Sequence, residues 1–131
     1  MKTLKTHLRN LLAIWSLFFF SAATLPAATI VWTNTTSGSF GIAANWSPNA
    51  VPGSVDVAII TNTGTYKVTL ATGTTLAGLQ LGSTNGADTN TLDTSGQTLT
   101  LNGGSIINSS GLLKLSSNLG ASGANVTNNG D

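Results

Sequence analysis

The stretch Gly96-Gln-Thr-Leu-Thr-Leu-Asn-Gly-Gly104 decides the fold. Threonine and leucine alternate from Thr98 to Leu101, so both leucines face one side of a strand. Glycine and asparagine, which favour turns, bound the strand on its two sides. Variants of this unit recur through the second half of the chain. The pattern predicts short strands joined by tight turns, and therefore an all-β fold.

Several other segments fit the same description, and Gly, Asn or Ser bounds each of them. They are 55–60, 66–70, 76–81, 91–93 and 113–115, beside 98–101 itself. The apolar residues Ile59, Leu70, Leu81 and Leu92 recur at a constant spacing along the chain. Short strands at such regular spacing favour an all-β sandwich, a barrel or a solenoid.

These architectures differ in how many large side chains their cores need. After Trp46 the only aromatic residue is Tyr66. A sandwich needs a dense two-sided core, whereas a parallel β-helix needs only a slim interior column of Leu, Ile and Val and is stabilised by the stacking of its coils. The sequence therefore predicts a parallel β-helix, with an antiparallel β-sandwich as the alternative.

Residues 1–28 have the order of a secretory signal peptide. Positive charge in 1–10 precedes an apolar run over 11–20, and small residues fill 21–28. The apolar run is only about half of the roughly 20 residues that a bilayer-spanning helix needs, which disfavours a membrane anchor. We expect cleavage after Ala23 or Ala27, no membrane span in the mature chain, and a product that is extracellular or at the cell surface.

The composition of residues 29–131 excludes one class of partner. Two lysines and four aspartates give this part of the chain a net charge of −2, so the formal +1 of the whole chain belongs to the leader. Nucleic-acid binding depends on clustered Lys and Arg, and no such cluster is present. Gly, Ser, Thr and Asn make up more than half of this part, which favours turns and strands over long helices.

The absence of cysteine bears on how the domain is stabilised. Small exported domains usually need disulfides, so we expect the stability to come from neighbouring repeats. The predicted organisation is a signal peptide (1–28), an N-terminal capping segment (29–60) and β-helix coils (61–131). We expect the coils to be incomplete at the C-terminus, as in a fragment of a longer repeat protein. Open strand edges there predict self-association.

Several motifs give the chain a family resemblance. They are Trp32, Asn45-Trp46, Val51-Pro52-Gly53 with Asp56 and Ile59, Leu76-Ala-Gly-Leu-Gln-Leu-Gly82 and Gly96-Gln-Thr-Leu-Thr-Leu-Asn-Gly103. Together they resemble the N-terminal region of exported bacterial β-helix proteins with autotransporter-associated β-strand repeats. The resemblance covers residues 29–115. It implies a right-handed parallel β-helix at or outside the cell surface, with an adhesive or structural role.

Residues that carry most enzyme chemistry are missing. Residues 29–131 contain no His, Cys, Glu or Arg, so Ser–His or Cys–His triads and His-ligated metal sites cannot form from them. Some β-helix enzymes cleave acidic polysaccharides with a basic residue, for which Lys67 or Lys114 could serve. Each lysine is more simply a charge on the solvent face of its strand. The sequence predicts no enzymatic activity and no cofactor.

Asp88, Asn90 and Asp93 form a candidate calcium site. Oxygen ligands at nearby positions suit a hard cation, and the segment faintly resembles a calcium-binding β-roll repeat. The double glycine of that repeat is missing and the motif occurs once. A plain turn is therefore the preferred interpretation, and no metal is predicted.

Trp32 and Trp46 are candidate carbohydrate contacts, because an exposed indole face stacks well on a sugar ring. The alternative is that they bury a large apolar area at the open end of the solenoid, where the first coil has no neighbour and needs a cap. The sequence favours the capping role and leaves the ligand role as the second possibility.

The function expected from these features is a structural or adhesive role in a non-enzymatic exported surface protein. Extracellular polysaccharide or cell-surface components are the expected partners. The first alternative is a polysaccharide-binding or polysaccharide-degrading β-helix whose active residues lie downstream of Asp131. The second is a two-sheet carbohydrate-binding module.

Overall fold

The structure is a computed structural model, and it describes residues 27–116, 119–121 and 126–129. Within these residues the chain forms short strands and a 3-10 turn, η1 (Ala43–Asn45). The strands are β1 (Thr29–Trp32), β2 (Gly38–Ser39), β3 (Trp46–Ser47), β4 (Val57–Ile60), β5 (Tyr66–Thr69), β6 (Thr74–Leu76), β7 (Gly78–Leu81), β8 (Asn90–Asp93), β9 (Leu99–Leu101), β10 (Ser105–Asn108), β11 (Gly111–Lys114), β12 (Leu119–Ala121) and β13 (Val126–Asn129). No helix among the described residues has the length and hydrophobicity that crossing a membrane requires.

These strands stack into three sheets. Sheet 1 has the order β13-β10-β7-β4-β1-β3, sheet 2 the order β11-β8-β5-β2, and sheet 3 the order β12-β9-β6. Neighbouring strands are parallel in all three sheets, except that β3 pairs antiparallel with β1. From β4 onward the chain visits sheets 1, 2 and 3 in turn, and three successive strands form one coil, whereas β1 and β2 are followed by β3, which returns to sheet 1. The predicted parallel β-helix is confirmed, and the antiparallel sandwich is wrong.

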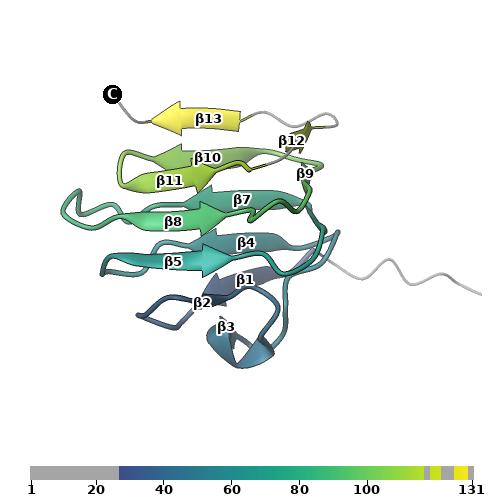
Figure 1. Ribbon diagram of the computed structural model, residues 1–131, viewed down its shortest axis with the longest axis horizontal. Coiled ribbons are helices and arrows are strands. Elements are labelled where there is room, and N and C mark those ends of the chain that lie inside the picture. The colour runs from purple at the N-terminus through teal and green to yellow at the C-terminus, as the bar shows by residue number, and fades with distance from the viewer. Residues whose placement is uncertain (1–26, 117–118, 122–125, 130–131) are drawn as a thin grey trace, which may run out of the picture.

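The direction of winding is visible in Figure 1. Strands β5 and β8 run to the right in front of β4 and β7, which run to the left, while the chain climbs from β1 to β13. A chain that winds in this sense is a right-handed solenoid. The handedness agrees with the strong general preference of parallel crossover connections.

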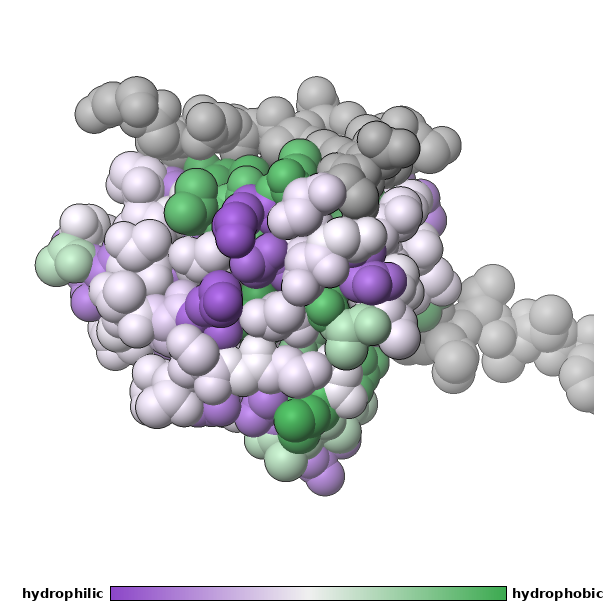
Figure 2. Space-filling model, viewed as in Figure 1, coloured by the Kyte–Doolittle hydropathy of each residue, from purple (hydrophilic) through white to green (hydrophobic). Residues whose placement is uncertain are grey.

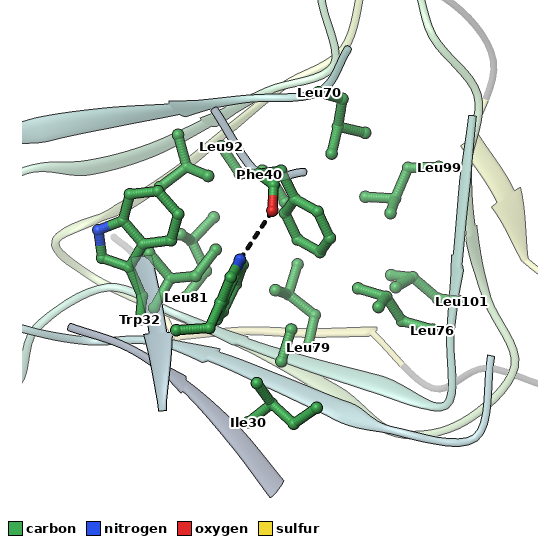
Figure 3. Close-up of a cluster of buried hydrophobic side chains, with 14 of the residues drawn as sticks. Ile30, Trp32, Phe40, Leu70, Leu76, Leu79, Leu81, Leu92, Leu99 and Leu101 are labelled. Atoms are coloured by element: carbon green, nitrogen blue, oxygen red, sulfur yellow. Dashed lines mark hydrogen bonds between the residues drawn. The ribbon is translucent and has the colours of Figure 1, made fainter. Parts of the chain in front are cut away.

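Aliphatic side chains stack in register inside the coils (Figure 3). Leu92 lies between Val68 and Leu113 in sheet 2, Leu81 between Ile60 and Ile107 in sheet 1, and Leu76 beside Leu101 in sheet 3. Figure 3 labels Leu76, Leu81, Leu92 and Leu101 of this set. The members from β4 to β9 are fully buried, whereas Ile107 and Leu113 are partly buried. Burial of a leucine or isoleucine contributes roughly 1.5–3 kcal/mol, so this column stabilises the stack.

Most of the predicted inward faces are confirmed. Tyr66, Val68 and Leu70 are buried together, as are the Leu79–Leu81 pair and the Leu99–Leu101 pair. The prediction for segment 113–115 is wrong in one respect. Leu115 lies beyond the end of β11 and is 43% exposed, so it does not repeat the inward position of Leu113.

The constant spacing from Ile59 to Leu92 is not the repeat of the solenoid. Each coil is longer than that spacing and varies in length, since Val57 pairs with Gly78 whereas Gln80 pairs with Ile106. The spacing therefore leads from one sheet to another. Ile59 faces outward between the buried Ala58 and Ile60, so the apolar run 55–60 is buried on one face only.

The boundary of the cap also differs from the prediction. Strands β1 and β4 already belong to the parallel stack, so coils begin at Thr29 and not after residue 60. The capping part is residues 40–56, hereafter the basal cap, which contains η1 and β3 and closes the lower end of the solenoid in Figure 1. The predicted signal peptide lies almost entirely outside the described residues, as do 117–118, 122–125 and 130–131 of the predicted coils.

Candidate functional site

Among the described residues, the aromatic side chains of Trp32, Phe40 and Trp46 gather at the basal cap. The rings of Trp32 and Trp46 meet edge to face with centroids 5.0 Å apart, and Phe40 packs edge-on against Trp46 at 4.8 Å. The Trp46 Nε1–H donates a hydrogen bond of 2.7 Å to the Phe40 carbonyl, as Figure 3 shows. The cap is therefore closed by apolar packing together with a satisfied indole donor.

Burial decides between the two roles predicted for these tryptophans. Trp32 is 0% exposed and Trp46 is 2% exposed. A sugar ring stacks on an indole face only if that face is open to solvent, so the carbohydrate-contact role of Trp32 and Trp46 does not fit the structure. Both rings instead fill the end of the column, where the first coil has no coil beneath it.

The turns that join sheet 1 to sheet 2 form one corner of the solenoid, hereafter the polar corner. It comprises residues 33–37, 61–65, 82–89 and 109–110 of successive coils. The fully buried Asn90 donates through Nδ2 to the carbonyl of Asn62 at 3.1 Å and to that of Gly64 at 2.8 Å. One coil thus satisfies the turn carbonyls of the coil before it.

The next coil repeats this arrangement, in which side chains donate to turn carbonyls of the preceding coil. The Asn108 Nδ2 donates to the Gly82 carbonyl at 2.7 Å, and the Ser110 hydroxyl donates to the carbonyl of the buried Ser83. A buried carbonyl without a partner costs about 1–3 kcal/mol, so these side chains lower the free energy of the stacked state. The polar corner is held by amides, hydroxyls and the Asp88 carboxylate, none of which titrates near neutral pH.

An ion pair lies on the outer face of sheet 2. The Lys114 Nζ contacts the Asp93 Oδ2 at 3.0 Å across neighbouring coils, and the Ser95 backbone N–H donates to Oδ1 of the same carboxylate at 2.9 Å. The hydrogen bond from Lys114 is the main reason why the pKa of Asp93 is lowered, with Ser95 adding to it. Lys67 and Lys114 are exposed on their strands, which confirms the solvent-face interpretation of both lysines.

Asp88 lies in the 82–89 turn, away from Asp93. Its Oδ2 accepts a hydrogen bond of 2.8 Å from the Asn85 Nδ2. The Gly64 backbone and then Asn85 lower the pKa of Asp88. The Asp88 carboxylate therefore stabilises its own turn through Asn85 and contacts the Gly64 backbone of the preceding coil.

The calcium candidates do not converge. Strand β8 alternates its side chains, so Asn90 points into the column while Asp93 points out of sheet 2. Asp88 belongs to the turn before the strand, and its carboxylate bonds to Asn85. Among the described residues, no three His, Cys, Asp or Glu side chains are placed to share a metal ion.

These features define the class of the molecule as a three-sided parallel β-solenoid whose interior polar groups join coil to coil. Comparison of the chain with protein-family models, curated proteins and solved structures found no match. The function is therefore inferred from the residues and geometry described above.

The roles of Asn108 and Ser110 were missed by sequence reasoning. Both residues are polar and follow the apolar pair Ile106-Ile107, which reads as the end of a strand and the start of a turn. Their partners lie 26 and 27 residues earlier in the chain. Since the offset between paired strands differs from coil to coil, no fixed sequence interval could have revealed the pairing.

Proposed function

We propose that this chain is a structural or adhesive segment of an exported surface protein, and that it performs no chemistry of its own. A rigid solenoid of this kind presents long, weakly charged faces outside the cell. The observation that carries the proposal is that the polar side chains of Asn90, Asn108 and Ser110 bond to backbone carbonyls of the preceding coil.

Two further contacts extend this pattern beyond the polar corner. The buried Ser105 hydroxyl accepts a hydrogen bond of 3.0 Å from the Leu79 backbone N–H, and the buried Thr94 Oγ1 accepts one of 3.0 Å from the Ser116 N–H. Each bond joins successive coils. Side chains with such fixed partners are poor candidates for binding or activating a substrate, and well suited to stiffening a scaffold.

The outward faces support a role in surface presentation. Thr75 and Thr100 are register partners on the outside of sheet 3, and Thr69 and Thr91 point outward from sheet 2. Figure 2, which looks onto sheet 2, shows a largely pale surface with a few strongly hydrophilic side chains, and hydrophobic side chains near its upper and lower ends. Adhesion through such a face would rest on many weak hydroxyl contacts to polysaccharide or other cell-surface components.

Export is the part of the proposal that is easiest to test. The full chain is expressed in a bacterial host, and the N-terminus of the product in each cell fraction is determined by mass spectrometry. We expect a shortened product outside the cytoplasm that begins at Thr24 or Ala28. A product that keeps Met1 and stays in the cytoplasm would overturn the proposal.

A matched pair of variants shows whether the leader directs export. Phe19→Arg places a charge within the apolar run, and we expect it to leave the chain unprocessed. Thr3→Arg adds the same charge to the positive N-terminal part and should be processed normally. Release of reducing ends from a polysaccharide panel by the purified exported product would contradict the non-enzymatic role and favour a polysaccharide-degrading β-helix.

A further inference from the structure

Three buried polar atoms have no hydrogen-bond partner among the described residues. They are the Trp32 Nε1, the Tyr66 hydroxyl and the Asn90 Oδ1. Buried polar atoms in folded proteins nearly always bond to the protein or to ordered water, because an unmet donor or acceptor costs about 1–3 kcal/mol. Three such atoms in so small a domain need a physical explanation.

The three residues occupy consecutive coils. The Trp32 ring stacks on the Tyr66 ring at an interplanar angle of 17° and a centroid distance of 6.4 Å. Tyr66 and Asn90 are register partners that open β5 and β8, directly after the turns of the polar corner. The three side chains are therefore neighbours in successive coils. Figure 3 shows the Trp32 nitrogen on the side of the ring away from Phe40.

The hydrogen-bonding capacities of the three groups are complementary but unmet. The indole N–H of Trp32 only donates, the Asn90 carbonyl oxygen only accepts, and the Tyr66 hydroxyl does both. Burial raises the pKa of Tyr66 to about 12, and a polar contact of the hydroxyl with the Asn62 backbone opposes this rise. The hydroxyl therefore keeps its proton at neutral pH. A small molecule that donates and accepts at once would complete all three groups.

We propose that the polar corner binds internal water, as one or two molecules that accept from the Trp32 Nε1–H and donate to the Asn90 Oδ1, with the Tyr66 hydroxyl as a further partner. An apolar occupant would leave the three atoms unmet. A hard cation needs six or more oxygen ligands, and the Trp32 N–H would repel it. Water, which makes about three hydrogen bonds when buried, fits the set.

The direct test is a high-resolution crystal structure of the exported product. We expect ordered water within about 2.7–3.2 Å of the Trp32 Nε1 and of the Asn90 Oδ1. Trp46 is the internal control, since its similarly buried N–H already bonds to the Phe40 carbonyl and should have no water. Direct hydrogen bonds among Trp32, Tyr66 and Asn90, or a corner without water density, would overturn the proposal.

Discussion

Asp93 and Asn90 show how the two faces of one strand assign different roles to neighbouring polar residues. Asn90 lies inside the column, where an amide can bond to carbonyls without the cost of burying a charge. Asp93 lies on the outer face, where its carboxylate is paired with the exposed Lys114 across the coils. The sequence offered these residues as weak candidate calcium ligands but favoured a plain turn. The two side chains have oxygen atoms of the kind that calcium binds, but the alternation of β8 puts Asn90 and Asp93 on opposite faces of the strand.

The ion pair on sheet 2 predicts how stability responds to acid. The folded-state pKa of Asp93 is lowered, so the carboxylate contributes stability above its unfolded pKa of about 3.9, and this contribution is lost as the pH falls through the folded pKa. We expect Lys114→Met to move this loss of stability to higher pH, because Lys114 is the main cause of the lowered pKa. Urea unfolding followed by circular dichroism between about pH 2 and pH 6 measures it.

Lys67→Met is the matched control for that experiment. Lys67 lies on the same face, but it lowers the pKa of Asp93 only through a weaker charge interaction. Lys67→Met should therefore shift the pH at which stability is lost in acid much less than Lys114→Met. Equal shifts in the two variants would show that general surface charge, and not the Lys114 contact, controls the carboxylate.

At the scale of elements, glycines set how closely the coils approach. Gly82 follows β7 with a positive φ of 99°, and a Cβ added there would collide with the Gly111 backbone of the next coil. Gly78 is similarly close, since an added Cβ would lie 2.6 Å from the Gly104 carbonyl oxygen. Contacts of this kind are between backbones, so a side chain cannot move aside to relieve them.

Replacing Gly82 by alanine should be costly. The variant combines an unfavourable φ with a backbone collision, and we expect a loss of about 3 kcal/mol or more in unfolding free energy. Gly86→Ala is the matched control, because Gly86 also has a positive φ of 70° but has no atom within 4 Å of the added Cβ. We expect it to lose only about 1 kcal/mol, as measured by urea denaturation. A similar loss in both variants would exclude the coil contact as the cause.

The sequence predicted the strands well because their signal is local. Alternation in Leu99-Thr-Leu101 or Tyr66-Lys-Val68 fixes which side chains share a face, whatever the strand pairs with. The coil length and the cap boundary depend instead on pairing between distant strands. Turns of different length, such as 61–65 and 82–89, vary the coil offset, so the constant spacing from Ile59 to Leu92 had no structural meaning.

At the scale of the whole molecule, stability comes from stacking on a closed base. Trp32, Phe40 and Trp46 fill the lower end, and above them a narrow aliphatic column continues from coil to coil. The composition after Trp46 correctly pointed to such a slim interior. The capping role of the tryptophans could be anticipated, whereas their burial against each other depends on η1 and β3 folding back under β1.

The measurement that tests this architecture most directly is disulfide formation between residues that only parallel stacking brings together. Thr75 and Thr100 are register partners on the outer face of sheet 3, and the chain has no cysteine of its own. Under mild oxidation Thr75→Cys/Thr100→Cys should form an intramolecular disulfide, because neighbouring strands bring Cα atoms to roughly 5 Å. The control pair Thr75→Cys/Thr91→Cys, which lies on different sheets, should stay reduced. Failure of the first pair to close, or equal closure of both pairs, would contradict the solenoid.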